Sequence, residues 1–147
     1  MKRSLFIAYS CAFLISFAVL QLEIAMTRIY SILTWHHFTP MIISIALLGF
    51  GSAGSILTLS QKKGNSNLFQ PKSIAKNAFL FSFFMLFSLL LIVRIYFEPL
   101  DLTKDPNNIL SLIYHYVFMA IPFLFAGLAL GSLSRYYYSH VARCACI

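Results

Sequence analysis

Residues 40–59, PMIISIALLGFGSAGSILTL, decide the fold class of this chain. The segment carries no charged side chain over its whole length, and roughly 20 helical residues are enough to cross a bilayer core. Its apolar residues run without alternation, which disfavours the short alternating strands of a membrane barrel. We therefore expect residues 40–59 to form a transmembrane helix, with Pro40 in its first turn.

Three further segments have the same character, and they cover residues 5–30, 77–97 and 109–133. The whole chain is 60% hydrophobic and only 10% charged, whereas soluble domains carry about 25% charged residues. Polar, turn-rich stretches at 60–76 and 98–108 separate the later spans. The sequence predicts an all-α polytopic membrane protein with four transmembrane helices, forming a single membrane domain over residues 1–147 without a soluble domain.

The basic residues predict how the helices are oriented. Eight of the eleven Lys and Arg fall on one side of a four-span arrangement: Lys2, Arg3, Lys62, Lys63, Lys72, Lys76, Arg135 and Arg143. Because loops rich in Lys and Arg stay in the cytoplasm, both termini are expected to be cytoplasmic and the protein to lie in the inner or plasma membrane. These residues sit at helix ends and in loops and are not expected to form one patch, so nucleic acid is not an expected partner.

Small residues are concentrated in the second and fourth spans. Gly49, Gly51 and Gly54 form a G-x-G-x-x-G pattern, but a dinucleotide site needs a preceding strand within a soluble βαβ unit. Inside an apolar span, glycines allow close approach of another helix. Gly127 and Gly131 form a G-x-x-x-G pattern in the fourth span. We expect these five glycines to be helix-packing residues that join spans two and four.

A few polar residues near the first span are candidates for an intramembrane site: Glu23, Thr27, Arg28, His36 and His37. Ionisable groups within a span are costly and indicate function by default. Glu23 and Arg28 are five positions apart, so on a helix they point about 140° away from each other. Two hypotheses stay open, a proton or substrate site at Glu23, or a structural role in which Glu23 pairs across helices and Arg28 reaches the membrane surface.

The sequence contains no arrangement that predicts catalysis. It shows no Ser/His/Asp set, no paired carboxylates and no phosphate-binding loop. The adjacent His36 and His37 diverge on a helix and lack further ligands at metal-binding spacing. We therefore predict no catalytic, cofactor-binding or metal-binding residue, and no enzymatic activity for the chain alone.

Two stretches resemble the N-terminal membrane region of polytopic spermidine-synthase-like proteins. The first half carries E-x-x-x-T-R from Glu23 to Arg28, then W-x-H-F over 35–38 and S-x-A-L-x-G-x-G over 44–51. The fourth span carries P-F-x-F-x-G-L over 122–128, followed by a basic exit at 134–136. In that family, further spans or a soluble aminopropyltransferase-like or methyltransferase-like domain follow the membrane region. The ending of this chain does not resemble such a continuation, so the resemblance implies a membrane module without the enzyme domain.

Together these observations predict a non-catalytic membrane anchor or scaffold module of a spermidine-synthase-like protein, in truncated or split form. Its expected partners are the lipid bilayer and either further helices, a soluble enzyme domain or a second copy of the chain. The alternative is a small oligomeric proton-coupled transporter that uses Glu23, because four short spans with one acid in the first helix resemble small multidrug transporters. A fragment without a function of its own is the third alternative.

Overall fold

The protein is an assembly of long helices. The computed structural model describes residues 2–33, 39–64, 66–94 and 106–145. It contains helices α1 (Lys2–Leu33), α2 (Thr39–Lys62), α3 (Pro71–Arg94) and α4 (Pro106–Ala145), and the short 3₁₀ helix η2 (Ser66–Phe69). The described residues include no strand. The all-α prediction is therefore confirmed.

Each of the four long helices contains a segment that is long and apolar enough to cross a membrane. Within the described residues these segments are Phe6–Ile32, Pro40–Lys62, Pro71–Leu91 and Tyr116–Tyr138. Large apolar side chains such as Phe6, Leu47 and Phe79 remain mostly exposed on the outside of the bundle. Such a surface fits a lipid environment, since lipid tails solvate apolar side chains. The chain is a multi-pass membrane protein, as predicted.

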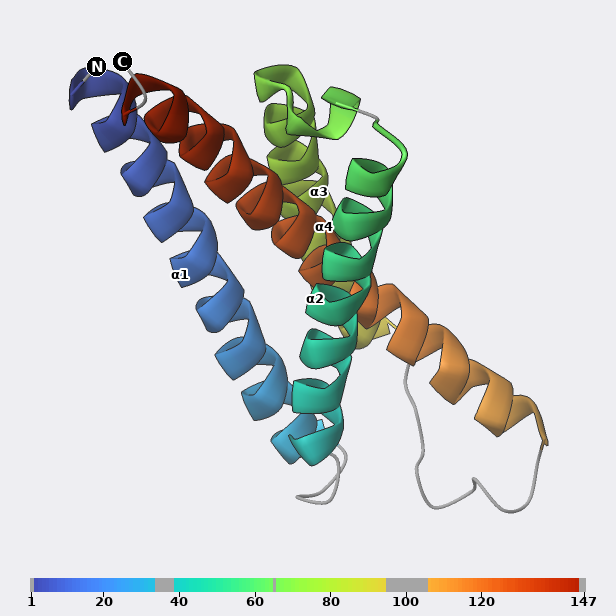
Figure 1. Cartoon of the computed structure of the whole chain (residues 1–147). Helices are drawn as coiled ribbons and strands as arrows, with labels where there is room; N and C mark the ends of the chain where they lie inside the picture. Colours follow the sequence, from blue (N-terminus) through green and yellow to red (C-terminus); the bar gives the residue numbers. More distant parts are fainter. Residues whose placement is uncertain (1, 34–38, 65, 95–105, 146–147) are drawn as a thin grey trace.

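Helix α4 lies at the centre of the arrangement and contacts all three other long helices. Figure 1 shows α4 running obliquely across the bundle, with α1 on one side and α2 and α3 around its middle. The start of α1, the end of α4 and the connection between α2 and α3 all lie at the same end of the molecule (Figure 1). This arrangement agrees with four alternating spans, and the cytoplasmic position of that end remains a prediction.

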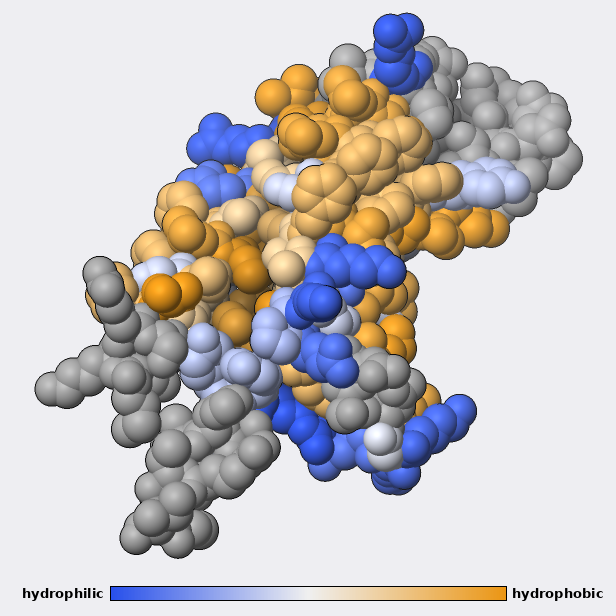
Figure 2. Space-filling model, turned by 90° about the horizontal axis from the view of Figure 1, so that it is seen from above, coloured by the Kyte–Doolittle hydropathy of each residue, from blue (hydrophilic) through white to orange (hydrophobic). Residues whose placement is uncertain are grey.

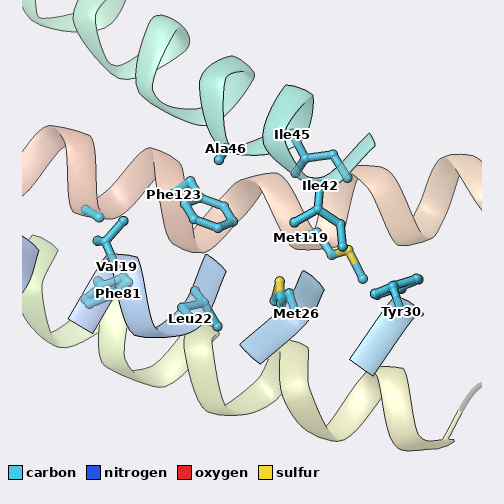
Figure 3. Close-up of a cluster of buried hydrophobic side chains, with 11 residues drawn as sticks. Val19, Leu22, Met26, Tyr30, Ile42, Ile45, Ala46, Phe81, Met119 and Phe123 are labelled. Atoms are coloured by element: carbon cyan, nitrogen blue, oxygen red, sulfur yellow. The ribbon is translucent and has the colours of Figure 1, made fainter. Parts of the chain in front are cut away.

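The core lies where α1, α2 and α4 meet. Figure 3 shows apolar side chains from these helices and from Phe81 of α3 pointing toward one another. The completely enclosed members are Leu22 and Met26 from α1, Ile42 and Ile45 from α2, and Met119 and Phe123 from α4. Because lipid already solvates apolar side chains, such a core holds helices together mainly through dense van der Waals contact.

Several helices extend beyond the spans that the sequence predicts. The stretch 60–76 was expected to be a polar loop, but α2 extends to Lys62 and α3 begins already at Pro71. The fourth predicted span ends at residue 133, whereas α4 continues to Ala145. Hydropathy locates the membrane-embedded part of a helix, whereas lysines and tyrosines outside it are compatible with continued helix. Pro71 fits the first turn of α3 because it has no N–H to satisfy there.

A compact turn connects α2 with η2. The backbone N–H of Lys63 donates to the carbonyl of Leu59 at 3.1 Å, and that of Gly64 donates to the carbonyl of Gln61 at 3.1 Å. Gly64 has a φ of 67°, the left-handed conformation that commonly ends a helix and that glycine adopts without strain. This turn brings η2 back against the end of the bundle, where it contacts α2, α3 and α4.

Candidate intramembrane polar site

The polar residues of the first span lie beside the apolar interface of α1, not within it. Leu22, Met26 and Tyr30 form the buried stripe of this helix (Figure 3). Glu23 directly follows Leu22 and is half-buried, so it flanks that stripe. A carboxylate in this position is partly shielded by the bundle and partly open to its surroundings.

Thr27 is satisfied by the backbone of its own helix. Its hydroxyl donates to the main-chain carbonyl of Glu23, one turn earlier. Such back-bonding is common for Thr in membrane helices and leaves the carboxylate uninvolved. Thr27 therefore lies near Glu23, as the spacing indicates, but it contacts the peptide group and not the acid.

Arg28 lies on an exposed face of α1, away from the buried stripe. Within the part of the chain that the structure describes, no ion pair joins Arg28 to Glu23 and no hydrogen bond of the Glu23 carboxylate is found. This separation follows from the five-residue spacing on a regular helix. His36 and His37 lie outside the described residues.

The glycines divide into two groups. Gly49 faces α4, where an added Cβ would lie 2.5 Å from Cβ of Phe123 and 2.9 Å from the carbonyl oxygen of Ala120. At Gly127, an added Cβ would lie 2.8 Å from Cβ of Ala53, and at Gly131 it would meet the side chain of Leu57. These three glycines lie in the α2–α4 interface, where the sequence placed them.

The expectation for the other two glycines of α2 is wrong within this chain. An added Cβ at Gly51 or Gly54 would meet no atom within 4 Å, and both glycines are exposed. Gly51 is two positions from Gly49 and therefore points about 160° away from it on a helix. Only one face of α2 can meet α4, and that face carries Gly49 and Ala53.

The structure also brings together residues that sequence analysis did not connect. Arg135 of α4 donates a hydrogen bond from its guanidinium to the side-chain oxygen of Gln61, at the end of α2. The same guanidinium lies 4.4 Å from the ring centre of Phe69 in η2. Gln61 and Arg135 are 74 positions apart, so no local pattern could indicate this contact.

A groove of about 350 Å³ opens between the first turns of α1 and the last turns of α4. Its lining is mainly apolar and aromatic: Ala8, Tyr9 and Ala12 from α1, and Leu133, Ser134, Tyr137 and Tyr138 from α4. Tyr137 and Tyr138 come from the tyrosine-rich end of the fourth span, and the sequence predicts an interface position for them because rings with one polar end are favoured there. The lining residues belong to the N-terminal half of α1 and the C-terminal half of α4.

The described residues contain no group of three or more His, Cys, Asp or Glu side chains placed to hold a metal ion. Comparisons of the chain with protein-family models, with curated proteins and with solved structures found no match. The function of this chain is therefore inferred from its geometry and from the motifs in its sequence.

Proposed function

We propose that this chain is a membrane anchor or scaffold module without catalytic activity of its own. The observation that carries this proposal is the filled interior of the bundle. Leu22, Met26, Ile42, Met119 and Phe123 are each less than 2% exposed and occupy the region where three helices meet. A dense apolar centre fixes the helices relative to one another, which suits a module that positions other components in the membrane.

The sequence motifs suggest what this module would position. The E-x-x-x-T-R and W-x-H-F motifs resemble the membrane region of spermidine-synthase-like proteins. On that basis the partner would be further helices or a soluble domain of the aminopropyltransferase or methyltransferase class. The exposed apolar faces of α1 and α3 leave room for additional helices beside the bundle.

A proton-coupled transporter remains the second candidate, because a specific residue favours it. Glu23 is half-buried within the span Phe6–Ile32. An ionisable side chain inside a membrane span is energetically costly and therefore indicates a function. In this alternative, protonation of the Glu23 carboxylate would be linked to movement of a cationic substrate. The two functions predict different results for the same substitution.

The experiment compares the wild-type chain with Glu23→Gln and Arg28→Gln after purification and reconstitution into liposomes. Arg28→Gln is the matched control, since it removes a charge from an exposed position of the same helix. Uptake of ethidium, a model cationic substrate, is followed by fluorescence under an imposed pH gradient. The scaffold proposal predicts no gradient-driven uptake by any of the three proteins.

Gradient-driven uptake by the wild type that is abolished in Glu23→Gln and kept in Arg28→Gln would contradict the scaffold proposal and establish the transporter.

The scaffold proposal also predicts that the chain holds an attached soluble protein at the membrane. A soluble fluorescent protein fused to its C-terminus should remain with the membrane through an alkaline carbonate wash and be released by detergent as a single species. Release of the fusion by carbonate would exclude an anchoring role.

A further inference from the structure

Five basic side chains surround η2 at one end of the bundle. Lys62 is the last residue of α2 and Lys63 follows it, Lys72 and Lys76 belong to the first turns of α3, and Arg135 comes from α4. Lys62, Lys63, Lys72 and Lys76 lie within a few residues of η2 along the chain, and the Arg135 guanidinium lies over Phe69 of η2. These five residues therefore belong to the end of the bundle around η2, and we call them the basic face. The sequence led us to expect dispersed charges, but the early start of α3 and the long α4 bring them together. Figure 2, which views the bundle from this end, shows hydrophilic side chains gathered beside the apolar surface.

Arg135 is the fixed member of the basic face. Its guanidinium lies over the ring of Phe69 and donates to Gln61, so residues of η2 and α2 hold a side chain that belongs to α4. Stacking on an aromatic ring stabilises a cation and restrains its orientation. A guanidinium has five N–H donors in a planar fork, and the bond to Gln61 leaves donors that can bind a phosphate group in bidentate fashion.

The chain has few acidic residues that could neutralise the basic face. It contains four acidic residues in all: Glu23 lies in α1, and Glu98, Asp101 and Asp105 lie outside the described residues. Among the described residues, no ion pair involves a member of the basic face. Lys72 even occupies the first turn of α3, where the helix dipole disfavours a positive charge and where no acid is present. An external anion would offset this repulsion.

The position of the basic face indicates where that anion lies. The candidate membrane span of α2 ends at Lys62, Lys72 and Lys76 lie near the start of the candidate span Pro71–Leu91, and Arg135 lies near the end of Tyr116–Tyr138. Exposed lysines beside these ends can extend their charged tips into the headgroup layer while their aliphatic stems stay against apolar surface. Clusters of four or more cations beside membrane helices attract anionic lipids in this way. The positive charge of the basic face and its position at the ends of the membrane spans therefore both favour an anionic lipid as the partner.

We propose that the basic face binds the phosphate groups of anionic phospholipids, with Arg135 contacting one phosphate directly and the four lysines holding neighbouring headgroups. This binding would fasten α2, α3 and α4 to the membrane surface at the end where η2 closes the bundle. It does not depend on whether the bundle acts as a scaffold or as a transporter.

The test measures lipid selectivity of the full chain in bilayers of phosphatidylcholine. Electron paramagnetic resonance gives the association constant of spin-labelled phosphatidylglycerol relative to that of spin-labelled phosphatidylcholine. The wild type should prefer phosphatidylglycerol, and added salt should weaken the preference. The double variant Lys72→Gln/Lys76→Gln should lower the preference several-fold, with an upper limit of roughly fivefold for each lysine.

The matched control is Arg28→Gln/Arg94→Gln, which also removes two positive charges, both from exposed positions outside the basic face. This control should keep the wild-type preference. Arg135→Lys provides a second, independent variant, because it keeps the charge but loses the planar fork. It should lower the preference for phosphatidylglycerol while its thermal midpoint in detergent stays near that of the wild type.

Three results would overturn the proposal. The first is a wild type without preference for phosphatidylglycerol, and the second is an equal loss of preference in the control and in Lys72→Gln/Lys76→Gln. The third concerns the source of the anion. If inorganic phosphate or a short RNA raised the thermal midpoint in pure phosphatidylcholine as much as phosphatidylglycerol does, the basic face would serve soluble anions and not lipids.

Discussion

Gly49 and Gly51 lie two positions apart in α2 and have opposite surroundings. A Cβ at Gly49 would lie 2.5 Å from Cβ of Phe123 and 3.0 Å from the main-chain nitrogen of Leu124. A Cβ at Gly51 would meet nothing within 4 Å. The inner face of α2, which carries Gly49 and Ala53, therefore touches the backbone of α4, while the outer face, which carries Gly51 and Gly54, remains open.

The difference between these faces shows what small residues contribute in a membrane protein. A glycine stabilises a helix pair only where a second backbone comes close enough to use the missing side chain. On the outer face the same residue type makes no such contact within this chain. Matched substitutions on the two faces, or in the core and on the lipid-exposed surface, measure this difference.

The largest expected effect comes from Phe123→Ala, which empties the centre of the core. Phe123 is completely buried, and its ring lies tilted relative to that of Phe50, with ring centres 6.4 Å apart. We expect a loss of about 3 kcal/mol, the lower part of the range for buried Phe, since separated helices would still be solvated by lipid. Unfolding by SDS, followed by circular dichroism, measures this loss.

Phe79→Ala is the control for this substitution, because Phe79 is 71% exposed on the outer surface of α3. Its free energy of unfolding should stay within about 0.5 kcal/mol of the wild type. Equal losses for the two variants would mean that the core around Phe123 does not hold the bundle together.

An intermediate effect is expected for Gly127→Ala. The added methyl group would lie 2.8 Å from Cβ of Ala53, an atom fixed directly to the backbone of α2. Forcing the helices apart should cost about 1–3 kcal/mol, the usual range for an overpacked interface. The same SDS titration applies.

The interface offers a direct rescue of this variant. The double substitution Gly127→Ala/Ala53→Gly moves one methyl group across the α2–α4 contact and restores the space between the helices. Its stability should recover to well above that of Gly127→Ala. If Ala53→Gly gave no recovery, the two residues would not face each other as described.

The smallest expected effect belongs to Gly131→Ala. Its added methyl group would meet the end of the Leu57 side chain, which can rotate to another position. We expect a loss below about 1 kcal/mol, visible as a small shift of the thermal midpoint in detergent. Gly54→Ala on the outer face should give no loss, and a larger loss there than at Gly131 would contradict the assignment of the two faces.

Hydropathy predicted the four spans because each is a long apolar run, and it could not locate helix ends outside the membrane. Hydropathy therefore predicts a loop where the lysine-rich start of α3 at Pro71 is helical. The sequence also indicated that Gly127 and Gly131 would meet α2, since they share one face of α4. It could not separate Gly49 from Gly51, because the face that α2 uses depends on where its partner lies.

In the candidate site, too, the sequence predicts relations within one helix but not contacts between helices. Helical spacing alone predicted that Glu23 and Arg28 would point apart, and the structure leaves them on different faces of α1. The contact of Arg135 with Gln61 and Phe69 had no local signal, since three different elements contribute to it. Contacts within one helix follow from its period, whereas contacts between helices depend on how the chain folds back.

The most direct test of the account is the difference in stability between Gly49→Ala and Gly51→Ala. Both variants add one methyl group to the same helix, so any difference in the free energy of unfolding reports the contact with α4. We expect Gly49→Ala to lose about 1–3 kcal/mol in an SDS titration and Gly51→Ala to match the wild type. Equal stability of the two variants, or a greater loss at Gly51, would contradict a bundle organised around the close contact of α2 with α4.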